Sequence, residues 1–282
     1  MAKVVYLHLG LHKTATGWLQ RQFFPRLGLP LHRTRKMEKI AALAAEPGTE
    51  ALIVSHEGLG GRIGDDKAPG DALNTFEATL RGIDGLPARS KVLIGFREHS
   101  AWIGSAYAQR GKKATVTADA YRDTYSLEEL SWVRRVELCD RRRLDSFLFL
   151  YEEFAHDPVA LCEDLCRFLG TPMPDDVASL LARRENPSPR TERGLRLARA
   201  AHGVARVLGA LPLTNAKRLR QAASEFGASF DSNETPVAVD FREVDKERLG
   251  EDWRRLVEIV AERRGRDFSA FLPYRRDIKA KV

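Results

Sequence analysis

Residues 3–20 read KVVYLHLGLHKTATGWLQ, and this segment carries the first signal of an α/β fold. Its first part, residues 3–9, is a short apolar run with β-branched side chains, which predicts a buried strand. A turn of small and polar residues follows over 10–17, and apolar residues from Trp18 to Phe23 then recur at helical spacing. A strand, a small-residue turn and a helix N-terminus together predict an anion site, because free backbone N–H groups and the helix dipole favour negative charge.

The turn also contains charged and hydroxyl side chains. Lys13 adds a full positive charge, and Thr14 and Thr16 add hydroxyl donors. The arrangement differs from the Walker A pattern G-x-x-x-x-G-K-[ST], in which the lysine follows the second glycine. Here Lys13 precedes Gly17, so a simple nucleoside triphosphate site is disfavoured. A tight strand–helix turn with a chance lysine is the alternative interpretation of this segment taken alone.

Three further apolar runs predict buried strands over 51–54, 91–96 and 147–150. Helical patterns alternate with them over 36–45, 72–84, 99–112 and 128–143. Strands that alternate with helices predict an α/β fold, with a parallel sheet and helices on both faces. Ligands of such sheets bind beyond the carboxyl ends of the strands. We therefore expect Gly10–Gly17, Ser55–Glu57 and Arg97–Ser105 to converge on one crevice.

The second half of the chain is expected to be mostly helical. Helical patterns cover 158–169, 175–183, 191–208, 215–226 and 246–264. We predict a single α/β domain over residues 1–282. Residues 1–170 would form a nucleotide-binding core, and the mostly helical residues 171–282 would complete it on the acceptor side.

Composition narrows the class of protein. The 282 residues are 43% hydrophobic, which is too much for a disordered chain, and no apolar run is long enough to predict a membrane span. The three cysteines, Cys139, Cys162 and Cys166, are too few for a disulfide scaffold and fit buried thiols in a reducing cytoplasm. The 46 basic and 39 acidic residues give a net charge of +7, which permits an anionic ligand, nucleic acid or a membrane surface without choosing between them. Side chains at metal-ligand spacing are not found, so no metal is expected.

The segment HLGLHKTATGWLQ, residues 8–20, resembles the phosphosulfate-binding loop of sulfotransferases that use 3′-phosphoadenosine 5′-phosphosulfate, PAPS. The positions that match this loop are Lys13, Thr14, Thr16, Leu19 and Gln20. Two positions depart from it, since Ala15 stands where the family usually has Gly and Gly17 stands where it usually has Thr or Ser. The resemblance implies a P-loop-like three-layer sandwich.

Two later segments extend the resemblance. In FREHSAWIGSAY, Arg97 ends a predicted strand and Ser105 lies on the next helix, as in the family's site for the 3′-phosphate. A guanidinium that forks onto a phosphate, with a hydroxyl as a further donor, is physically reasonable. Residues 147–170 resemble the family's strand, turn and helix, an architectural segment in which Tyr151 and Glu152 would fix the strand–helix corner.

The resemblance implies a bacterial-type, cytoplasmic sulfotransferase that moves a sulfuryl group from PAPS to a hydroxyl or amine. Lys13 would neutralise the bridging oxygen as 3′-phosphoadenosine 5′-phosphate, PAP, leaves, and the loop N–H groups of Ala15–Trp18 would hold the 5′-phosphate. Glu57 is the first choice for the base and His56 the alternative. His8 is expected to pack within its strand, whereas His12 could touch the sulfonate or the acceptor. The acceptor is a small molecule or glycan, with a carbohydrate or lipid-linked glycan as one expectation, and nucleic acid is not expected as a partner.

Two other functions stay open at this point. One is a P-loop-like kinase, against which the position of Lys13 argues. The other is a nucleotide-binding relative without catalytic activity, which the departures at Ala15 and Gly17 make conceivable.

Overall fold

The computed structural model describes residues 3–61, 72–111, 116–182, 196–198, 200–201, 239 and 241–272. Its centre is a sheet of five parallel strands in the order β2-β3-β1-β4-β5. The strands are β1 (Val4–His8), β2 (Leu31–His32), β3 (Ala51–Ser55), β4 (Arg89–Phe96) and β5 (Asp145–Leu150). The α/β fold class with a parallel sheet is thus confirmed. The two-residue edge strand β2 was not predicted, because two residues are too short to carry an alternating pattern.

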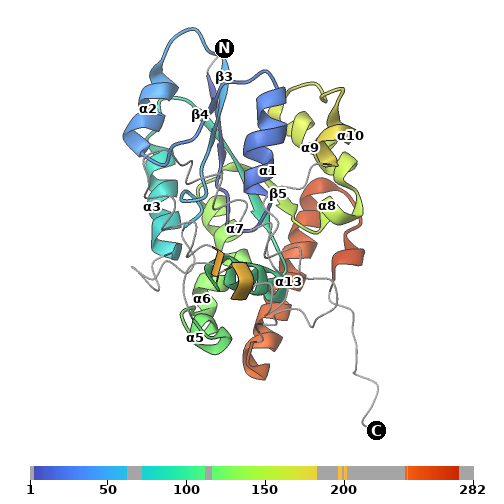
Figure 1. Ribbon diagram of the computed structural model, residues 1–282. Helices are drawn as coiled ribbons and strands as arrows, with labels where there is room; N and C mark the ends of the chain where they lie inside the picture. Colours follow the sequence, from blue (N-terminus) through green and yellow to red (C-terminus); the bar gives the residue numbers. More distant parts are fainter. Residues whose placement is uncertain are drawn as a thin grey trace.

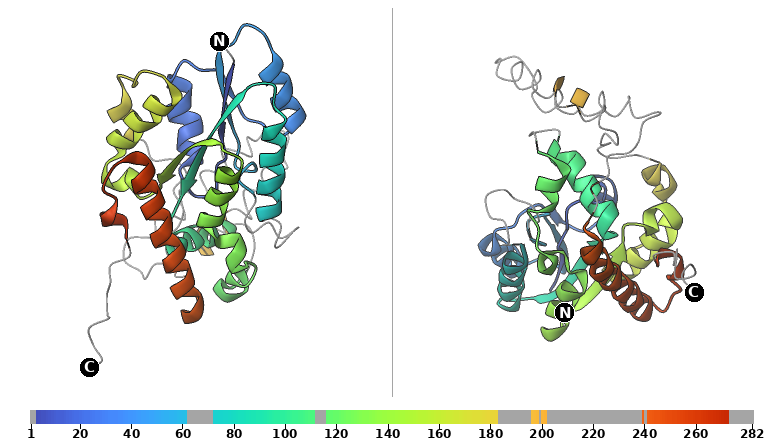
Figure 2. Two further views of the ribbon diagram at one scale, coloured as in Figure 1. Left: turned by 180° about the vertical axis from the view of Figure 1, so that it is seen from behind. Right: turned by 90° about the horizontal axis from the view of Figure 1, so that it is seen from below.

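Helices cover both faces of the sheet (Figure 1). One face packs against α2 (Met37–Ala45), α3 (Ala72–Asp84), α4 (His99–Gly111), α7 (Trp132–Arg141) and α13 (Glu243–Arg264). The other face packs against α1 (Thr16–Trp18), the π-helical turn η1 (Leu19–Phe23), the 3₁₀ turn η2 (Phe24–Arg26), α9 (Pro158–Leu169) and α10 (Val177–Leu181). The views from behind and from below show the same three layers (Figure 2).

Short helices complete the connections, namely α5 (Ala118–Arg122), α6 (Leu127–Leu130), α8 (Glu153–His156) and the 3₁₀ turn η3 (Ser269–Phe271). The single helix expected over 128–143 is two helices, α6 and α7. They are separated at Ser131, which ends α6 in an extended conformation and caps α7 by accepting a hydrogen bond from the Arg134 N–H. A serine side chain competes with the helix for backbone donors and therefore favours such a break.

The C-terminal part is described only in places. The helices predicted over 191–208 and 215–226 lie outside the described residues, except that 196–198 and 200–201 are helical. Helix α13 packs on α7 and β5 and so adds to the same core as the first half of the chain. The extent of one domain over 1–282 stays a prediction.

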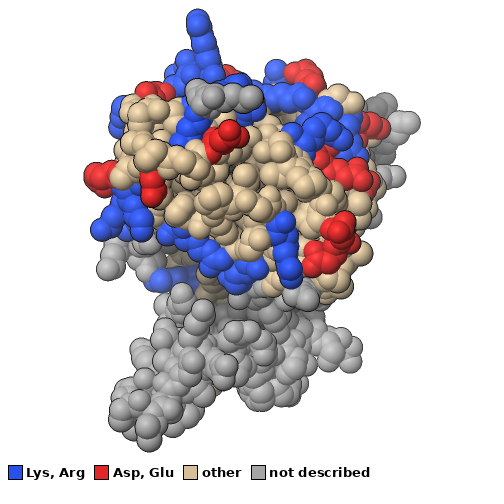
Figure 3. Space-filling view, turned by 90° about the horizontal axis from the view of Figure 1, so that it is seen from above, with Lys and Arg blue, Asp and Glu red and all other residues tan. Residues whose placement is uncertain are grey.

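The cysteines are buried in the core, and the charged side chains on the surface form ion pairs. Cys139, Cys162 and Cys166 are free and buried. No helix in the described part of the chain is both long enough and apolar enough to cross a membrane. At the end of the molecule where β1 begins, basic side chains are interspersed with acidic ones (Figure 3). Ion pairs of this kind join Lys91 and Asp145 at the starts of β4 and β5.

Candidate active site

The loop after β1 has a strained backbone. Lys13 and Ala15 adopt the left-handed conformation, with φ of 67° and 61°, although neither is glycine. Each such residue costs about 1–2 kcal/mol, and backbone strain of this kind concentrates at ligand-binding sites. When successive residues alternate between right-handed and left-handed backbone conformations, their N–H groups point toward one concave side. An anion can bind there. The left-handed Ala15 also explains why a glycine suits this position in the family that the loop resembles.

The loop is held tightly from within. Thr14 and Thr16 are buried, and both hydroxyls donate to the Leu11 carbonyl, at 2.8 and 3.2 Å. Gly10 has no space for a side chain, since a Cβ there would lie 2.6 Å from Thr16 Oγ1. A hydroxyl has one hydrogen to donate. The Thr14 and Thr16 hydroxyls, expected from the sequence to be donors toward an anion, therefore use their hydrogens within the loop.

Two tryptophans hold the loop and the end of β4 in place. Trp102 Nε1 on α4 donates to the His12 carbonyl at 2.8 Å, and Trp132 Nε1 on α7 donates to the Arg97 carbonyl at 2.9 Å. Arg97 Nη1 in turn donates to the Lys13 carbonyl at 3.5 Å. The contacts of Trp102 and Arg97 join the loop after β1 to the segment that follows β4. The strand order reverses between β1 and β4, and ligands of such sheets bind at this point.

The predicted pair Arg97 and Ser105 lies on this side of the loop. The Arg97 guanidinium stacks on the Tyr151 ring, 4.4 Å from its centroid. Ser105 is half-buried on α4, three residues after Trp102, and so shares the helix face that reaches the loop. Tyr151 therefore does more than shape a corner. Glu152 does fix the corner, because its Oε1 accepts from the Glu98 N–H at 3.0 Å.

A chain of hydrogen bonds links Gln20, which follows the loop, to the ends of β3 and β1. Gln20 Nε2 donates to Ser55 Oγ at 2.9 Å, and Ser55 Oγ lies 2.8 Å from His8 Nδ1. His8 is fully buried beside Phe24, as the sequence predicts. Burial lowers the pKa of His8 to about 4, although the charge of Glu57 opposes this. His8 is therefore neutral near pH 7 and serves as a structural group.

Glu57 meets the loop across the crevice. His12 Nδ1 lies 3.1 Å from Glu57 Oε2, and the two side chains are 29% and 41% exposed. Burial raises the pKa of Glu57, but the hydrogen bond from His12 and the positive charges of His12, Lys13 and His56 outweigh it, so that this pKa is lowered overall. Glu57 is thus a carboxylate at neutral pH, close to Lys13.

His56 is held in a different way. Its Nδ1 accepts a hydrogen bond from the Gly58 N–H at 2.8 Å, which ties the ring to the turn after β3. The structure therefore brings Lys13, His56 and Glu57 together, as the strand ends predict. The contact of His12 with Glu57 was not predicted. The sequence could have indicated this contact, because His12 directly precedes Lys13 in a loop that is expected to lie beside the end of the strand before Glu57.

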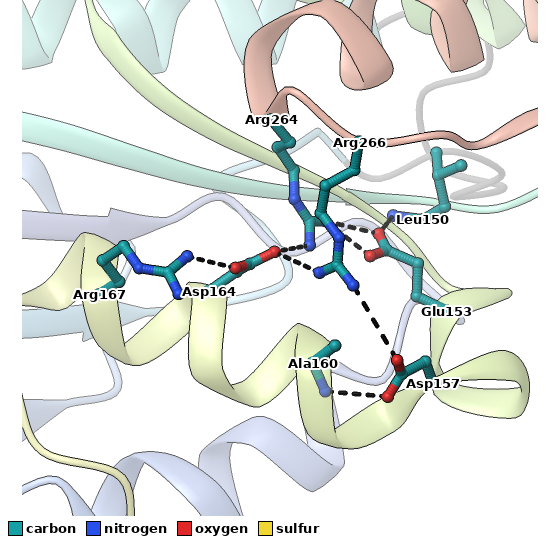
Figure 4. Close-up of polar contacts among 8 residues, drawn as sticks. All are labelled: Leu150, Glu153, Asp157, Ala160, Asp164, Arg167, Arg264 and Arg266. Carbon is teal, nitrogen blue, oxygen red and sulfur yellow. Dashed lines mark hydrogen bonds and ion pairs between the residues drawn. The ribbon is translucent and has the colours of Figure 1, made fainter.

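A second charged cluster joins residues of α8, α9 and the end of α13 (Figure 4). Arg264 at the end of α13 pairs with Glu153 on α8, Nη1 to Oε2 at 2.6 Å, and with Asp164 on α9. Arg266 also pairs with Asp164, at 2.8 Å. Arg264, Glu153 and Asp164 are 6%, 6% and 10% exposed, so this cluster joins three helices within the protein. Among the described residues, groups of three or more side chains suited to a metal ion are not found.

The comparisons with solved structures give sequence identities of 12–16% and TM-scores below 0.5. No family model and no curated protein matches the sequence. A sulfotransferase from Alicyclobacillus acidocaldarius is 14% identical over 96% of this chain and 99% of its own, with a TM-score of 0.47. The sulfotransferase domain of the Synechococcus PCC 7002 olefin synthase is 12% identical over 90% of this chain and 95% of its own, with a TM-score of 0.46. Mouse sulfotransferase SULT7A1, complexed with PAP, is 16% identical over 64% of this chain and 63% of its own, with a TM-score of 0.40.

At these identities and TM-scores, the argument for a function rests on the residues of this chain.

Proposed function

We propose that this protein transfers a sulfuryl group from PAPS to a hydroxyl or amine of an acceptor. The observation that carries the proposal is the gathering of Lys13 and Glu57 around a strained anion-binding loop at the carboxyl ends of β1 and β3. The loop sequence resembles the phosphosulfate-binding loop. This reaction needs a cation for the leaving phosphate and a base function at the acceptor, and Lys13 and Glu57 lie where these are required.

In the proposed reaction, a bond forms between the acceptor oxygen and sulfur while the bond from sulfur to the bridging phosphate oxygen breaks. The proton of the acceptor passes to the protein, and PAP leaves with the bonding electron pair. The two oxygens must lie in line with sulfur, so positioning and electrostatics supply most of the catalysis. Phosphoryl transfer has the same requirements. Lys13 neutralises the charge that develops on the bridging oxygen, and the N–H groups of Ala15–Trp18 hold the 5′-phosphate.

We assign the 3′-phosphate to Arg97 and Ser105. The Arg97 guanidinium is fixed by Tyr151 and by the carbonyl of Lys13, so it lies next to the loop. A planar guanidinium with a fixed orientation loses little entropy when it binds a phosphate. The adenosine would therefore extend from the loop toward α4.

The base function of the site depends on Glu57. Its carboxylate lies close to Lys13, and it is partly exposed to an acceptor. The alternative, His56, is less suited, because the nitrogen that would take a proton already accepts from Gly58. A hydroxyl of a carbohydrate or lipid-linked glycan is the acceptor class we favour.

The first test is calorimetric titration of the purified protein with PAP, beside ATP with Mg²⁺ and adenosine 5′-phosphate. We expect PAP to bind at one site, much more tightly than the other two. Tighter binding of ATP with Mg²⁺ would favour a kinase. Tight PAP binding without turnover of PAPS on any acceptor would favour a non-catalytic relative.

Lys13→Ala tests the role of the loop. We expect the turnover of PAPS to fall about 10²- to 10³-fold, because one preorganised cation at the leaving oxygen is lost. The melting temperature should stay within about 2 °C, since the Lys13 side chain is only half-buried and its removal leaves the packed core unchanged. Lys39→Ala, at an exposed position on α2, is the matched control and should keep full turnover. Unchanged turnover in Lys13→Ala would contradict the assignment of the loop.

A further inference from the structure

His12 and Glu57 form a pair whose hydrogen-bond directions can be derived from the contacts. The lowered pKa of Glu57 keeps it a carboxylate, and a carboxylate only accepts hydrogen bonds. The contact of 3.1 Å between His12 Nδ1 and Glu57 Oε2 therefore requires the hydrogen to lie on Nδ1. In the neutral ring the other nitrogen, Nε2, then has a free lone pair and can take a proton.

The other described histidines near the loop lack this property. The Nδ1 of His56 accepts from the Gly58 N–H, so the neutral ring of His56 has its hydrogen on Nε2 and its lone pair is already used. His8 is fully buried and bonded to Ser55. His12, by contrast, is 29% exposed and precedes Lys13. Its backbone is fixed, because Trp102 holds its carbonyl.

We infer that His12 is the group that receives the acceptor's proton, at Nε2, and that Glu57 positions the ring by holding Nδ1–H. This inference rests on the proposed sulfuryl transfer and divides its base function between two residues. As the new S–O bond forms, the proton of the acceptor hydroxyl moves to Nε2, and the electron pair of the broken S–O bond leaves with PAP. Glu57 then stabilises the imidazolium, as a carboxylate does wherever it orients a catalytic histidine.

The pair also suits the neighbouring charges. Lys13 is the next residue, so one loop supplies the group for the leaving oxygen and the group for the attacking oxygen. A side chain of the imidazole type suits proton transfer near neutral pH better than a carboxylate whose pKa is lowered. The positive charges of Lys13 and His56 act on Glu57, and the charge of Glu57 acts on buried His8. Arg97 donates to the Lys13 carbonyl, and Arg35 lies beside Gly58.

The first test reads the ring directly and does not need an acceptor. Two-dimensional ¹H–¹⁵N NMR of the histidine rings, with His12 assigned by its loss in His12→Asn, reports which nitrogen has the hydrogen. We expect the Nδ1–H form in the wild-type protein and a shift to Nε2–H in Glu57→Ala. An Nε2–H form of His12 in the wild-type protein would overturn the inference.

The second test compares His12→Asn with the wild-type protein in turnover of PAPS, on a panel of simple alcohols and methyl glycosides. The Asn side chain keeps an N–H donor near the position of Nδ1, and so can still hold Glu57, but it has no basic Nε2. We expect kcat to fall about 10²- to 10⁴-fold while the affinity for PAP is unchanged. Glu57→Ala combined with His12→Asn should be no worse than His12→Asn alone, because the pair acts as a unit.

Retention of kcat within about threefold in His12→Asn, together with a large loss in Glu57→Ala, would show that Glu57 itself is the base and would overturn the inference. His156→Asn, at an exposed position on α8, is the control and should match the wild-type protein. If the wild-type protein neither binds PAP nor turns over PAPS, the proposed function fails, whereas the NMR result still decides whether the pairing exists.

Discussion

Two charged clusters follow strands of the same sheet and differ in how their polar groups are paired. The crevice cluster, His12 with Lys13 and Glu57, follows β1 and β3 and is partly exposed. The buried corner, Glu153 with Asp164 and Arg264, follows β5 and is nearly inaccessible. In the sequence both contain an acidic residue shortly after an apolar run, Glu57 after residues 51–54 and Glu153 after residues 147–150. Position after a strand therefore does not separate the carboxylate of the candidate site from a structural one, whereas burial and pairing do.

The physical reason is the cost of burying charge. In the buried corner the carboxylate of Glu153 accepts from Arg264 and from the Leu150 N–H, so the buried charge is balanced and hydrogen-bonded. Such a cluster is strongly destabilised if one partner is removed. In the crevice cluster Glu57 keeps part of its surface open to solvent, and a substrate can replace that solvent.

The largest expected effect on stability comes from removing the centre of the buried corner. Arg264→Met keeps the length and the apolar stem of the side chain but leaves the buried carboxylate of Glu153 without its arginine, whereas Asp164 keeps its pairs with Arg167 and Arg266. We expect the free energy of unfolding to fall by about 3–5 kcal/mol. The measurement is urea denaturation followed by circular dichroism.

The control for this change lies on the same helix. Arg255 is 56% exposed and pairs with Glu258, so Arg255→Met should change the free energy of unfolding by less than about 0.5 kcal/mol. If Arg264→Met were as stable as Arg255→Met, the distinction between the two clusters would lose its energetic basis.

A middle-sized effect is expected at His8, beneath the crevice cluster. The pKa of His8 is about 4 in the folded protein, whereas the ordinary value of a histidine, which applies to the unfolded chain, is 6.5. Between these values the unfolded chain binds more protons, so the contribution of His8 to stability is present above pH 6.5 and is lost as pH falls toward 4. From pH 7 to pH 5 the loss is about 2 kcal/mol. Urea denaturation at the two pH values measures it.

His8→Asn isolates this contribution from that of other groups. The variant lacks the titrating ring. Between pH 7 and pH 5 its free energy of unfolding should therefore fall by about 2 kcal/mol less than that of the wild-type protein. Parallel pH curves for the two proteins would be evidence against a neutral, structural His8.

The smallest effect is expected at Ala15 in the loop. Because Ala15 has a φ of 61° and a ψ of 11°, Ala15→Gly removes backbone strain, and this outweighs the greater freedom of glycine in the unfolded chain. We expect a gain of about 0.5–1 kcal/mol in the free energy of unfolding. Ala42→Gly, in the exposed middle of α2, should lose about 1 kcal/mol instead. If Ala15→Gly lowered the free energy of unfolding as Ala42→Gly does, this would argue against strain at Ala15.

Local patterns predicted much of the fold. The helices over 72–84 and 158–169 have the bounds that the sequence predicts, because their apolar faces and flanking residues mark both ends. Four of the strands were predicted from short apolar runs, whereas β2 and the break at Ser131 were not. A two-residue edge strand exists through its pairing with β3, and Ser131 ends a helix through contacts that spacing does not reveal.

The sequence established the parallel α/β order, the small-residue loop with Lys13 and the ends of strands at which a site should form. These properties depend on residues close together in the chain, and periodicity and turn chemistry record them. Only the tertiary structure decided that His12 meets Glu57, that Trp102 and Trp132 hold the loop and Arg97, and that Arg264 balances Glu153. Such contacts join residues far apart in the chain, so they depend on the packing of helices against the sheet and leave no periodic signal in the sequence.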